Sequence, residues 1–417
     1  MIQRNITSAL QAALSDTPVV LLHGARQTGK STLAQWLAKH EPGRRYITFD
    51  NASMLAAAGE DPEGFLAGLE KPVVLDEIQR VPALFLAIKS DVDASRRPGR
   101  YLLTGSANIQ LLPQLSELLV GRMEILTLWP FSAGELERST ERFVDTLFSP
   151  DPSFPESEPV TKADLIDRII RGGYPEVVSR ESLHRRKAWY NSYMTTITQR
   201  DVRDLASIER LSVMHRLLGL VAARTASLLN YSELSRSLGV PQSTLKRYFT
   251  LLEGTFLVKT LLPWSANLSK RIVKSPKVFL NDTGLVTALL DLDSAKLTAD
   301  PTLTGRVLET FVAMELVKQI SWSHTRPYLY HFRTQSGDEV DFVLENSAGD
   351  IVGIEVKTAA AVKSGDLKGL RYLQTTTGSR FRRGIVLYAG SEMVPFSKNL
   401  HALPVNTLWQ INAKTAE

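Results

Sequence analysis

Short apolar runs alternate with helix-forming segments over the first 148 residues of the chain. Apolar runs of this length between turn signals are typical of buried strands, and their alternation with helices predicts a parallel sheet with right-handed crossovers. We expect strands at 19–22, 46–49, 73–75, 101–103 and 124–128. Residues 1–148 are therefore predicted to form an α/β domain.

The pattern changes after residue 148. Residues 149–161 are rich in proline and acidic residues, which predicts a linker or an exposed loop. Residues 162–300 have a mostly helical pattern, and residues 301–417 return to strand–helix alternation. In this last part we expect one helix and four strands, at 308–320, 328–333, 339–344, 351–357 and 383–388.

Composition narrows the class of protein. With 417 residues, 43% hydrophobic and 22% charged, the chain is long enough for two or three globular domains. It contains no cysteine, which excludes disulfides, thiolate catalysis and cysteine-ligated metals. No apolar run reaches the length of a membrane span, and the first residues lack the apolar core of a signal peptide. We expect a cytoplasmic protein with no membrane partner.

A P-loop motif, G-x-x-x-x-G-K-[ST], lies between the first predicted strand and a helix-forming segment, at residues 24–31. The alternative is an ordinary strand-to-helix turn with a surface lysine. In a P-loop, Lys30 would reach the β- and γ-phosphates of ATP and the Ser31 hydroxyl would bind Mg²⁺. The residues expected to bind the nucleotide are Gly24, Ala25, Arg26, Gln27, Thr28, Gly29, Lys30, Ser31 and Thr32.

Two acids end the predicted strand at 73–75, and they favour hydrolysis over binding alone. Asp76 is placed to hold the Mg²⁺ ion and Glu77 to polarise the water that attacks the γ-phosphate. The alternative is a solvated pair of acids at the start of a helix.

Two further positions in this domain have open interpretations. Thr104, Ser106 or Asn108, after the strand at 101–103, would sense the γ-phosphate, or would form a simple turn with a helix cap. Arg122 would be an arginine finger or sensor, acting within the chain or on a neighbouring one, or a cation at a helix C-terminus. An arginine acting on a neighbour requires a homo-oligomer.

Residues 230–262 have the pattern of a helix-turn-helix followed by a wing strand. The exposed face of the second helix would offer Gln242, Ser243, Lys246 and Arg247 to the major groove of DNA. The net charge of +5 favours a polyanionic partner only mildly. A basic run would follow DNA phosphates, with Lys270, Arg271, Lys274 and Lys277. The alternative is a module for packing or protein contact.

Charged residues also interrupt two apolar strands near the C-terminus. Glu355 and Lys357 are two residues apart and so share one face of a strand, and Asp341 lies in the strand before it. With Glu309 or Glu315 on the preceding helix, this spacing resembles the core of the PD-(D/E)xK nuclease superfamily. That resemblance implies a second Mg²⁺ site formed by the acids, with Lys357 beside the attacking water. The alternative is a hairpin with one surface salt bridge.

Several runs taken together resemble an AAA-type ATPase family of bacteria and archaea that carries a C-terminal DUF4143 domain. The runs are 24–31, 73–79, 103–108, 119–132, 172–176 and 274–285. The resemblance covers nearly the whole chain and favours a finger or sensor role for Arg122. It also marks Arg26 and Asp50 as recurrent positions without a defined role.

The sequence as a whole predicts a Mg²⁺-dependent ATPase that acts on DNA, including branched or structured DNA, through a winged helix and a nuclease-like domain. One alternative is a signalling or regulatory switch whose C-terminal domains bind protein. Another is a Mg²⁺-dependent DNA nuclease with a regulatory ATPase.

Overall fold

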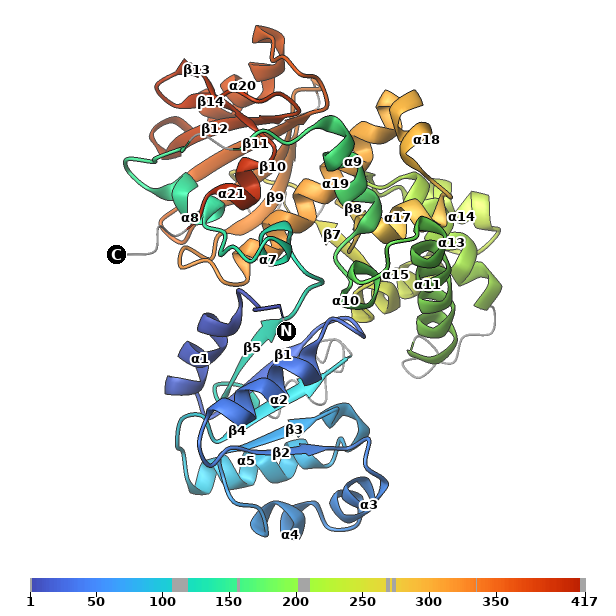
Figure 1. Ribbon diagram of the computed structural model, residues 1–417, viewed down its shortest axis with the longest axis vertical. Helices are drawn as coiled ribbons and strands as arrows, with labels where there is room; N and C mark the ends of the chain where they lie inside the picture. The colour runs from blue at the N-terminus through green and yellow to red at the C-terminus, as the bar shows by residue number, and fades with distance from the viewer. Residues whose placement is uncertain are drawn as a thin grey trace.

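The computed structural model describes residues 2–106, 119–155, 158–201, 211–267, 271, 275–334 and 336–412. In Figure 1 a five-stranded sheet with its helices forms the lower part of the molecule. The later elements form the upper part, with helices on the right and a second sheet on the left.

The lower sheet is parallel throughout and has the strand order β2-β3-β4-β1-β5. All five strands predicted from the sequence are confirmed. Their bounds are β1 Val19–His23, β2 Arg45–Thr48, β3 Val73–Asp76, β4 Tyr101–Gly105 and β5 Met123–Thr127. The helices of this part are α1 Thr7–Asp16, α2 Lys30–His40, α3 Ala52–Glu60, α4 Pro62–Ala67 and α5 Leu84–Ala94.

Helices cover both faces of this sheet. Val20 and Leu22 of β1 pack with α1 and α2, whereas Val19 and Leu21 pack on the opposite face with α3, α4 and α5. Burial on both faces explains why β1 is a continuous apolar run rather than an alternating one. The carboxyl ends of these strands point toward the upper part of the molecule (Figure 1).

The middle part is helical, as predicted, and also contains a small antiparallel sheet of order β6-β8-β7. Its strands are β6 Ser227–Leu228, β7 Val258–Leu261 and β8 Lys277–Leu280. Its helices are α9 Lys162–Arg171, α10 Pro175–Val178, α11 Leu183–Thr196, α13 Leu211–Ala223, α14 Tyr231–Leu238, α15 Gln242–Gly254, α17 Thr283–Leu289 and α18 Ser294–Ala299. A π-helical turn, Ile197–Asp201, follows α11.

The C-terminal part is a mixed six-stranded sheet of order β13-β14-β12-β11-β10-β9. The predicted helix and four strands are confirmed, and β13, β14 and two helices are additional. The strands are β9 Tyr328–Arg333, β10 Glu339–Glu345, β11 Ile351–Lys357, β12 Phe381–Tyr388, β13 Val394–Ser397 and β14 Leu400–Pro404. The helices are α19 Pro301–Ile320, α20 Lys368–Thr377 and α21 Thr407–Gln410.

The segment that joins the lower sheet to the helical middle part lies against the C-terminal sheet. Helices α7 Ala133–Leu136 and α8 Phe143–Phe148 lie beside α21 (Figure 1). The expected linker contacts the same part, since the side chains of Arg383 and Asn406 donate hydrogen bonds to the carbonyl oxygens of Ser149 and Glu158. The described residues of this predicted linker are therefore held against the C-terminal sheet.

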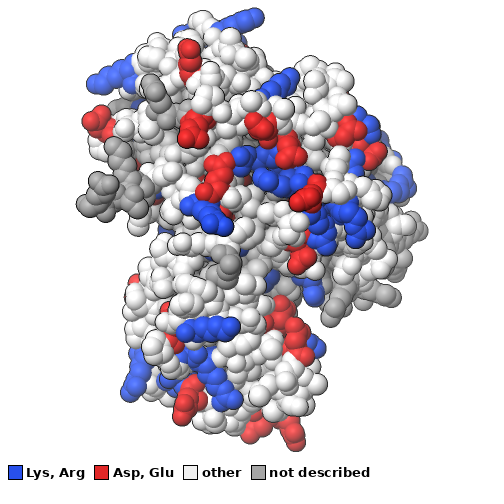
Figure 2. Space-filling model, viewed as in Figure 1, with Lys and Arg blue, Asp and Glu red and all other residues white. Residues whose placement is uncertain are grey.

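Among the described residues, no helix is both long and apolar enough to cross a membrane. Charged side chains of both signs are interspersed over the face shown in Figure 2, without a continuous basic area. The net positive charge is therefore not gathered into one patch on this face.

Candidate functional site

The loop between β1 and α2 has the backbone conformation that its glycines allow. Gly24 and Gly29 have φ angles of 148° and 95°, and Gln27 also lies in the left-handed region at 61°. A Cβ atom on Gly24 would lie 2.2 Å from the carbonyl oxygen of Leu128, which follows β5. This close approach excludes any side chain at Gly24 and fixes where the loop begins.

The ammonium group of Lys30 lies folded over this loop. It donates hydrogen bonds to the carbonyl oxygens of Gly24, at 3.0 Å, and Ala25, at 2.8 Å. Burial, and then the charge of Lys30, lowers the pKa of His23 to about 3, so that its imidazole is neutral at physiological pH. With His23 neutral, Lys30 and Arg26 are the cations of this loop that line the cavity beside it.

The carboxylate of Asp76, at the end of β3, accepts hydrogen bonds from three hydroxyl groups. The Ser31 hydroxyl donates to its Oδ1 at 3.0 Å and the Tyr46 hydroxyl to its Oδ2 at 2.7 Å. The Thr104 hydroxyl also donates to Oδ1. Hydroxyl and carboxylate oxygens are ligands that Mg²⁺ prefers, so the side chains of Ser31 and Asp76 fit this ion.

Glu77 follows in the left-handed conformation, with φ 60°. Its backbone N–H donates to the Thr104 hydroxyl at 3.2 Å, and its carboxylate accepts a hydrogen bond from the Gln79 side-chain amide. The same amide nitrogen of Gln79 donates to Ser106 Oγ at 3.1 Å. The structure thus brings Glu77 and Ser106 together through Gln79, which the sequence patterns did not single out.

A cavity of about 510 Å³ separates the P-loop from α11. One wall is formed by Lys30, Ser31, Glu77, Ser106 and their neighbours, and the other by Trp189, Ser192, Tyr193, Thr196 and Ile197. A nucleotide bound at the P-loop would therefore lie against the helical part. Sequence reasoning missed this wall because α11 carries no nucleotide-binding motif.

Hydrogen bonds continue from this cavity into the middle part. The Tyr193 hydroxyl donates to the carbonyl oxygen of Arg26 at 3.3 Å and lies 3.1 Å from the Tyr174 hydroxyl. The Asn281 amide donates to the Tyr174 hydroxyl at 3.0 Å. Asn281 directly follows β8, so the P-loop is connected to that strand through two tyrosines.

Arg4 supports the P-loop from the other side. Its guanidinium donates to the carbonyl oxygens of Thr28, at 2.7 Å, and Trp129, at 2.6 Å, and to the Glu135 carboxylate at 3.1 Å. It also lies 4.6 Å from the centre of the Phe131 ring. No sequence motif marks this residue.

Arg122 lies at the amino-terminal end of the parallel strands, whereas the P-loop lies at their carboxyl end. The backbone N–H of Val19, at the start of β1, donates to its carbonyl oxygen at 3.2 Å, whereas the P-loop leaves the other end of β1. Its guanidinium pairs with Asp93 at 2.5 Å. Arg122 therefore cannot reach the P-loop of its own chain. Asp50, a position without a defined role, pairs with Arg80 at 2.5 Å.

Two helices, α14 and α15, lie where the sequence predicts a helix-turn-helix. Gly239 ends α14 with a φ of 68°, and α15 ends at Gly254, as expected. The four side chains predicted to face DNA are all exposed on α15, namely Gln242, Ser243, Lys246 and Arg247.

The predicted basic run is placed differently from the expectation. Lys270 and Lys274 lie outside the described residues. Arg271 is only 7% exposed and pairs with Glu345 at 2.6 Å. Lys277 is also buried, so in this conformation neither cation faces a DNA phosphate.

The C-terminal acids lie in one cluster, but with a lysine among them. Lys277 Nζ lies 2.6 Å from Glu309 Oε1 and 3.3 Å from Asp341 Oδ1. The ammonium of Lys357 lies 3.3 Å from the Glu355 carboxylate. Among the residues that the structure describes, no group of three acids or histidines is arranged to hold a metal ion. The cluster therefore does not fit the second Mg²⁺ ion expected from the sequence.

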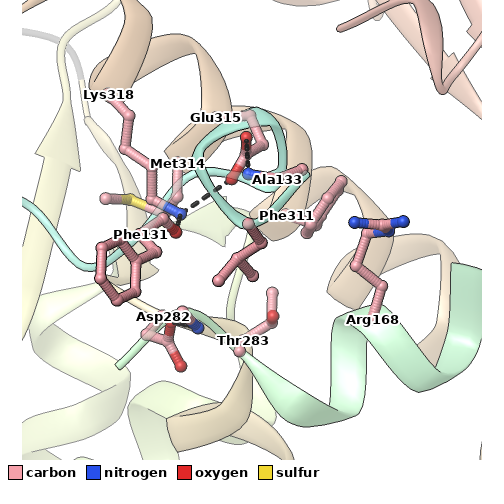
Figure 3. A pocket seen from close by; sticks show the side chains of 12 residues that line it. Phe131, Ala133, Arg168, Asp282, Thr283, Phe311, Met314, Glu315 and Lys318 are labelled. Carbon is pink, nitrogen blue, oxygen red and sulfur yellow. Dashed lines mark hydrogen bonds and ion pairs between the residues drawn. The ribbon is translucent and has the colours of Figure 1, made fainter. Parts of the chain in front are cut away.

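Glu315, the alternative to Glu309, belongs to a different site. Its carboxylate accepts a hydrogen bond from the backbone N–H of Ala133 at 2.9 Å and from Lys318 at 2.8 Å. Lys318 also donates to the carbonyl oxygen of Phe131 at 2.9 Å. Figure 3 shows these side chains of α19 pointing toward the segment that enters α7. Glu315 therefore anchors this segment, and Glu309 is the helix acid of the C-terminal cluster.

Three family models match successive parts of the chain. The model described as an AAA domain matches residues 16–137. Two models of domains of unknown function, DUF8612 and DUF4143, match residues 162–296 and 304–408.

Two mycobacterial proteins are similar over nearly the full length. The uncharacterized proteins Mb2031c of Mycobacterium bovis and Rv2008c of Mycobacterium tuberculosis are each 32% identical over 409 residues. Each alignment covers 97% of this chain and 84% of the relative.

Two solved structures match the chain weakly. A RuvB variant from Thermotoga maritima is 21% identical with a TM-score of 0.29, covering 61% of this chain and 88% of its own. AMPPCP-bound DnaA from Aquifex aeolicus is 14% identical with a TM-score of 0.30, covering 60% and 85%. These TM-scores are too low for either match to say anything about the fold or function of this chain.

Proposed function

The chain belongs to a family of AAA proteins with a DUF4143 domain, and we propose that it is a Mg²⁺-dependent ATPase whose nucleotide state controls binding to DNA. The observation that carries the ATPase proposal is the 3.0 Å hydrogen bond between Ser31 and Asp76 beside Lys30. It joins the two oxygen groups that a nucleotide-bound Mg²⁺ ion needs, at the start of a helix whose N-terminus favours anions.

Each residue of this site has a defined task. Lys30 would exchange its loop carbonyl partners for phosphate oxygens, and Ser31 and Asp76 would hold Mg²⁺, which neutralises phosphate charge when bound. Glu77 would accept the proton of the attacking water. Gln79 would hold the Glu77 carboxylate in place and connect it to Ser106, which would sense the γ-phosphate.

Arg122 is assigned a role only between chains. Arg122 lies at the amino-terminal end of the strands, away from its own P-loop, and this position supports an arginine finger that enters the site of a neighbouring copy. A homo-oligomer follows from this assignment.

The DNA proposal is supported by the order of elements in the middle part. The sequence α13–β6–α14–α15–β7–β8, with the sheet order β6-β8-β7, is the arrangement expected of a winged helix. The second helix of the pair, α15, presents exposed Lys246 and Arg247 on the face that would enter a major groove.

The C-terminal element order α19–β9–β10–β11–α20–β12 supports a PD-(D/E)xK-like fold. Its acids, however, surround a lysine, so we assign no cutting step to this part. If DNA binding fails, a regulatory ATPase that binds protein is the remaining function.

The ATPase proposal is tested by measuring ATP turnover of the wild type and of Glu77→Gln, with and without single-stranded, duplex and branched DNA. We expect Glu77→Gln to lower kcat by about 100-fold or more while ATP still binds. Glu63→Gln, an exposed acid of α4, is the matched control and should leave kcat unchanged. Normal turnover by Glu77→Gln would show that the base is misassigned.

DNA binding is tested separately by titrating duplex and branched DNA at several salt concentrations. Replacing Lys246 and Arg247 by alanine should weaken binding and lower the slope of log affinity against log salt by about 2. The control replaces Arg96 and Arg97, two exposed arginines of the AAA part, and removes the same charge. No binding by the wild type at low salt would exclude the DNA proposal.

A further inference from the structure

Three carboxylates and two ammonium groups share a buried region between the middle and C-terminal parts. Glu309 comes from α19, Asp341 from β10, and Glu355 and Lys357 from β11. The fifth group, Lys277, comes from β8 in the sheet of the middle part. The cluster is therefore completed by a residue from outside the C-terminal part.

Lys277 lies where a cation would neutralise the carboxylates of Glu309 and Asp341. Its residue is 6% exposed, and its ammonium is held between Glu309 at 2.6 Å and Asp341 at 3.3 Å. The second oxygen of Asp341 accepts the backbone N–H of Val356 at 2.9 Å. Both oxygens of Asp341 are thus committed to groups of this chain.

The charges of the cluster agree with this arrangement. Burial and the charge of Asp341 raise the pKa of Glu309, and the ammonium of Lys277 opposes that rise by favouring the ionised carboxylate. Burial lowers the pKa of Lys277, but Glu309 and Asp341 outweigh that effect and raise it above its usual value. The two carboxylates therefore keep the ammonium charged.

A second ion pair of the same kind joins the other end of β10 to the middle part. Arg271 binds both carboxylate oxygens of Glu345, at 2.6 Å and 3.2 Å. Its guanidinium lies 5.5 Å from the centre of the Trp264 ring and 4.8 Å from that of Tyr330. Two cations from residues 271–277 thus hold β10 near both of its ends.

We propose that Lys277 takes the place of a divalent cation in this acid cluster, so that the cluster is an ionic clamp between β8 and β10 rather than a metal site. Breaking a buried ion pair by removing one partner leaves an uncompensated charge, whereas removing both partners costs much less. In this proposal the C-terminal part stabilises the packing of the middle part against it, through the ion pairs of Lys277 with Glu309 and Asp341.

The first test measures Mn²⁺ binding by electron paramagnetic resonance, on the full chain without nucleotide. Every variant carries Asp76→Asn, so that Mn²⁺ at the P-loop does not contribute. We expect no Mn²⁺ binding that depends on Asp341. One bound Mn²⁺ per chain that is lost on Asp341→Asn would overturn the proposal.

The second test is a double-mutant cycle on apparent melting temperature with Lys277→Met and Glu309→Gln. Each single change should lower it by about 5–15 °C, and the double variant should lose clearly less than the sum. The control is the exposed pair Lys296→Met and Asp291→Asn, with losses near zero, where Asp291 also pairs with Lys187 at the surface. Additive losses at Lys277 and Glu309 would contradict the clamp.

A further variant protects the test against misfolding. If Lys277→Met gives no folded protein, Lys277→Arg keeps a cation between the acids. It should melt within a few degrees of the wild type and still exclude Mn²⁺. An Lys277→Arg chain that binds Mn²⁺ through Asp341 would contradict the proposal.

Discussion

The guanidinium of Arg4 donates a hydrogen bond of 2.7 Å to the carbonyl oxygen of Thr28, inside the P-loop. The same group reaches Trp129 and Glu135, beyond the last strand of the AAA sheet. One buried cation from the N-terminal segment thus fixes the phosphate loop relative to the segment that leads to the upper part.

Replacing Arg4 by methionine should therefore weaken nucleotide binding. The variant removes hydrogen bonds from a charged donor, which contribute about 1.5–3 kcal/mol each, and so leaves the loop less well ordered. We expect the Kd for ATP to rise by about tenfold, as measured by calorimetry. The control is Arg97→Met, an exposed arginine of the same part. An unchanged Kd would show that the loop holds its shape without Arg4.

Gln79→Ala should lower kcat without changing the affinity for ATP. Gln79 contacts Glu77 and Ser106 but does not belong to the P-loop. Without it the Glu77 carboxylate is free to rotate, and we expect kcat to fall by about tenfold with the Kd for ATP unchanged. Gln79→Glu, which places a like charge beside Glu77, should be at least as slow. A parallel loss of affinity would mean that Gln79 acts on binding.

Gly24→Ala should destabilise the AAA part. The new Cβ would meet the carbonyl oxygen of Leu128 at 2.2 Å in a backbone conformation that alanine rarely adopts. We expect a loss of about 2–4 kcal/mol in the free energy of unfolding, measured with urea. Gly59→Ala is the matched control, because nothing lies within 4 Å of its Cβ position in α3. That change should be neutral or stabilise by up to about 1 kcal/mol.

Glu141→Gln should reduce the dependence of stability on pH. Burial, and then the charge of Glu315, raises the pKa of Glu141 to about 8. The folded chain therefore holds a proton that the unfolded chain loses near pH 4.5. This contribution to stability is complete below about pH 4.5 and is lost as the pH rises through about 8.

Melting temperatures measured between pH 5 and pH 9 check this prediction. The wild type should become less stable across the range, and Glu141→Gln should have a flatter profile. Glu63→Gln, at an exposed position, should follow the wild-type profile. Identical profiles for Glu141→Gln and the wild type would place the titrating group elsewhere.

Trp189→Phe should remove most of the fluorescence change on ATP binding. Trp189 lines the cavity opposite Lys30, so a bound nucleotide alters its surroundings. Phenylalanine keeps the ring that stacks with Tyr193, whose centre lies 5.0 Å away. A full signal in Trp189→Phe would show that the nucleotide does not reach α11.

The arrangement of the candidate nucleotide site could be predicted from the sequence because its geometry is local. The glycines, Lys30 and Ser31 are contiguous, and Asp76 directly ends an apolar strand. The end of the sheet at which Arg122 lies was not predicted, since a role within its own chain was left open. Arg122 comes just before β5, and a residue before a parallel strand lies at the opposite end of the sheet from a loop that follows one.

The ionic clamp formed by Lys277 could not be predicted in the same way. Lys277 and Asp341 are 64 residues apart, and only the fold brings them together. In the sequence, Arg271 and Lys277 belong to a basic run, and a basic run is usually exposed. Val394–Ser397, the edge strand β13, was missed because its side chains are mostly exposed and give no apolar alternation.

Strand β8 begins at Lys277, and Asn281 directly follows it. An extended strand of this length spans only about 13 Å, and it has little capacity to stretch. At one end Asn281 is bonded to Tyr174, near the cavity at the P-loop, and at the other Lys277 is bonded to Glu309 of α19 and Asp341 of β10. The strand therefore joins the cavity at the P-loop to β10 with no loop between them, and we expect a displacement at one end to reach the other.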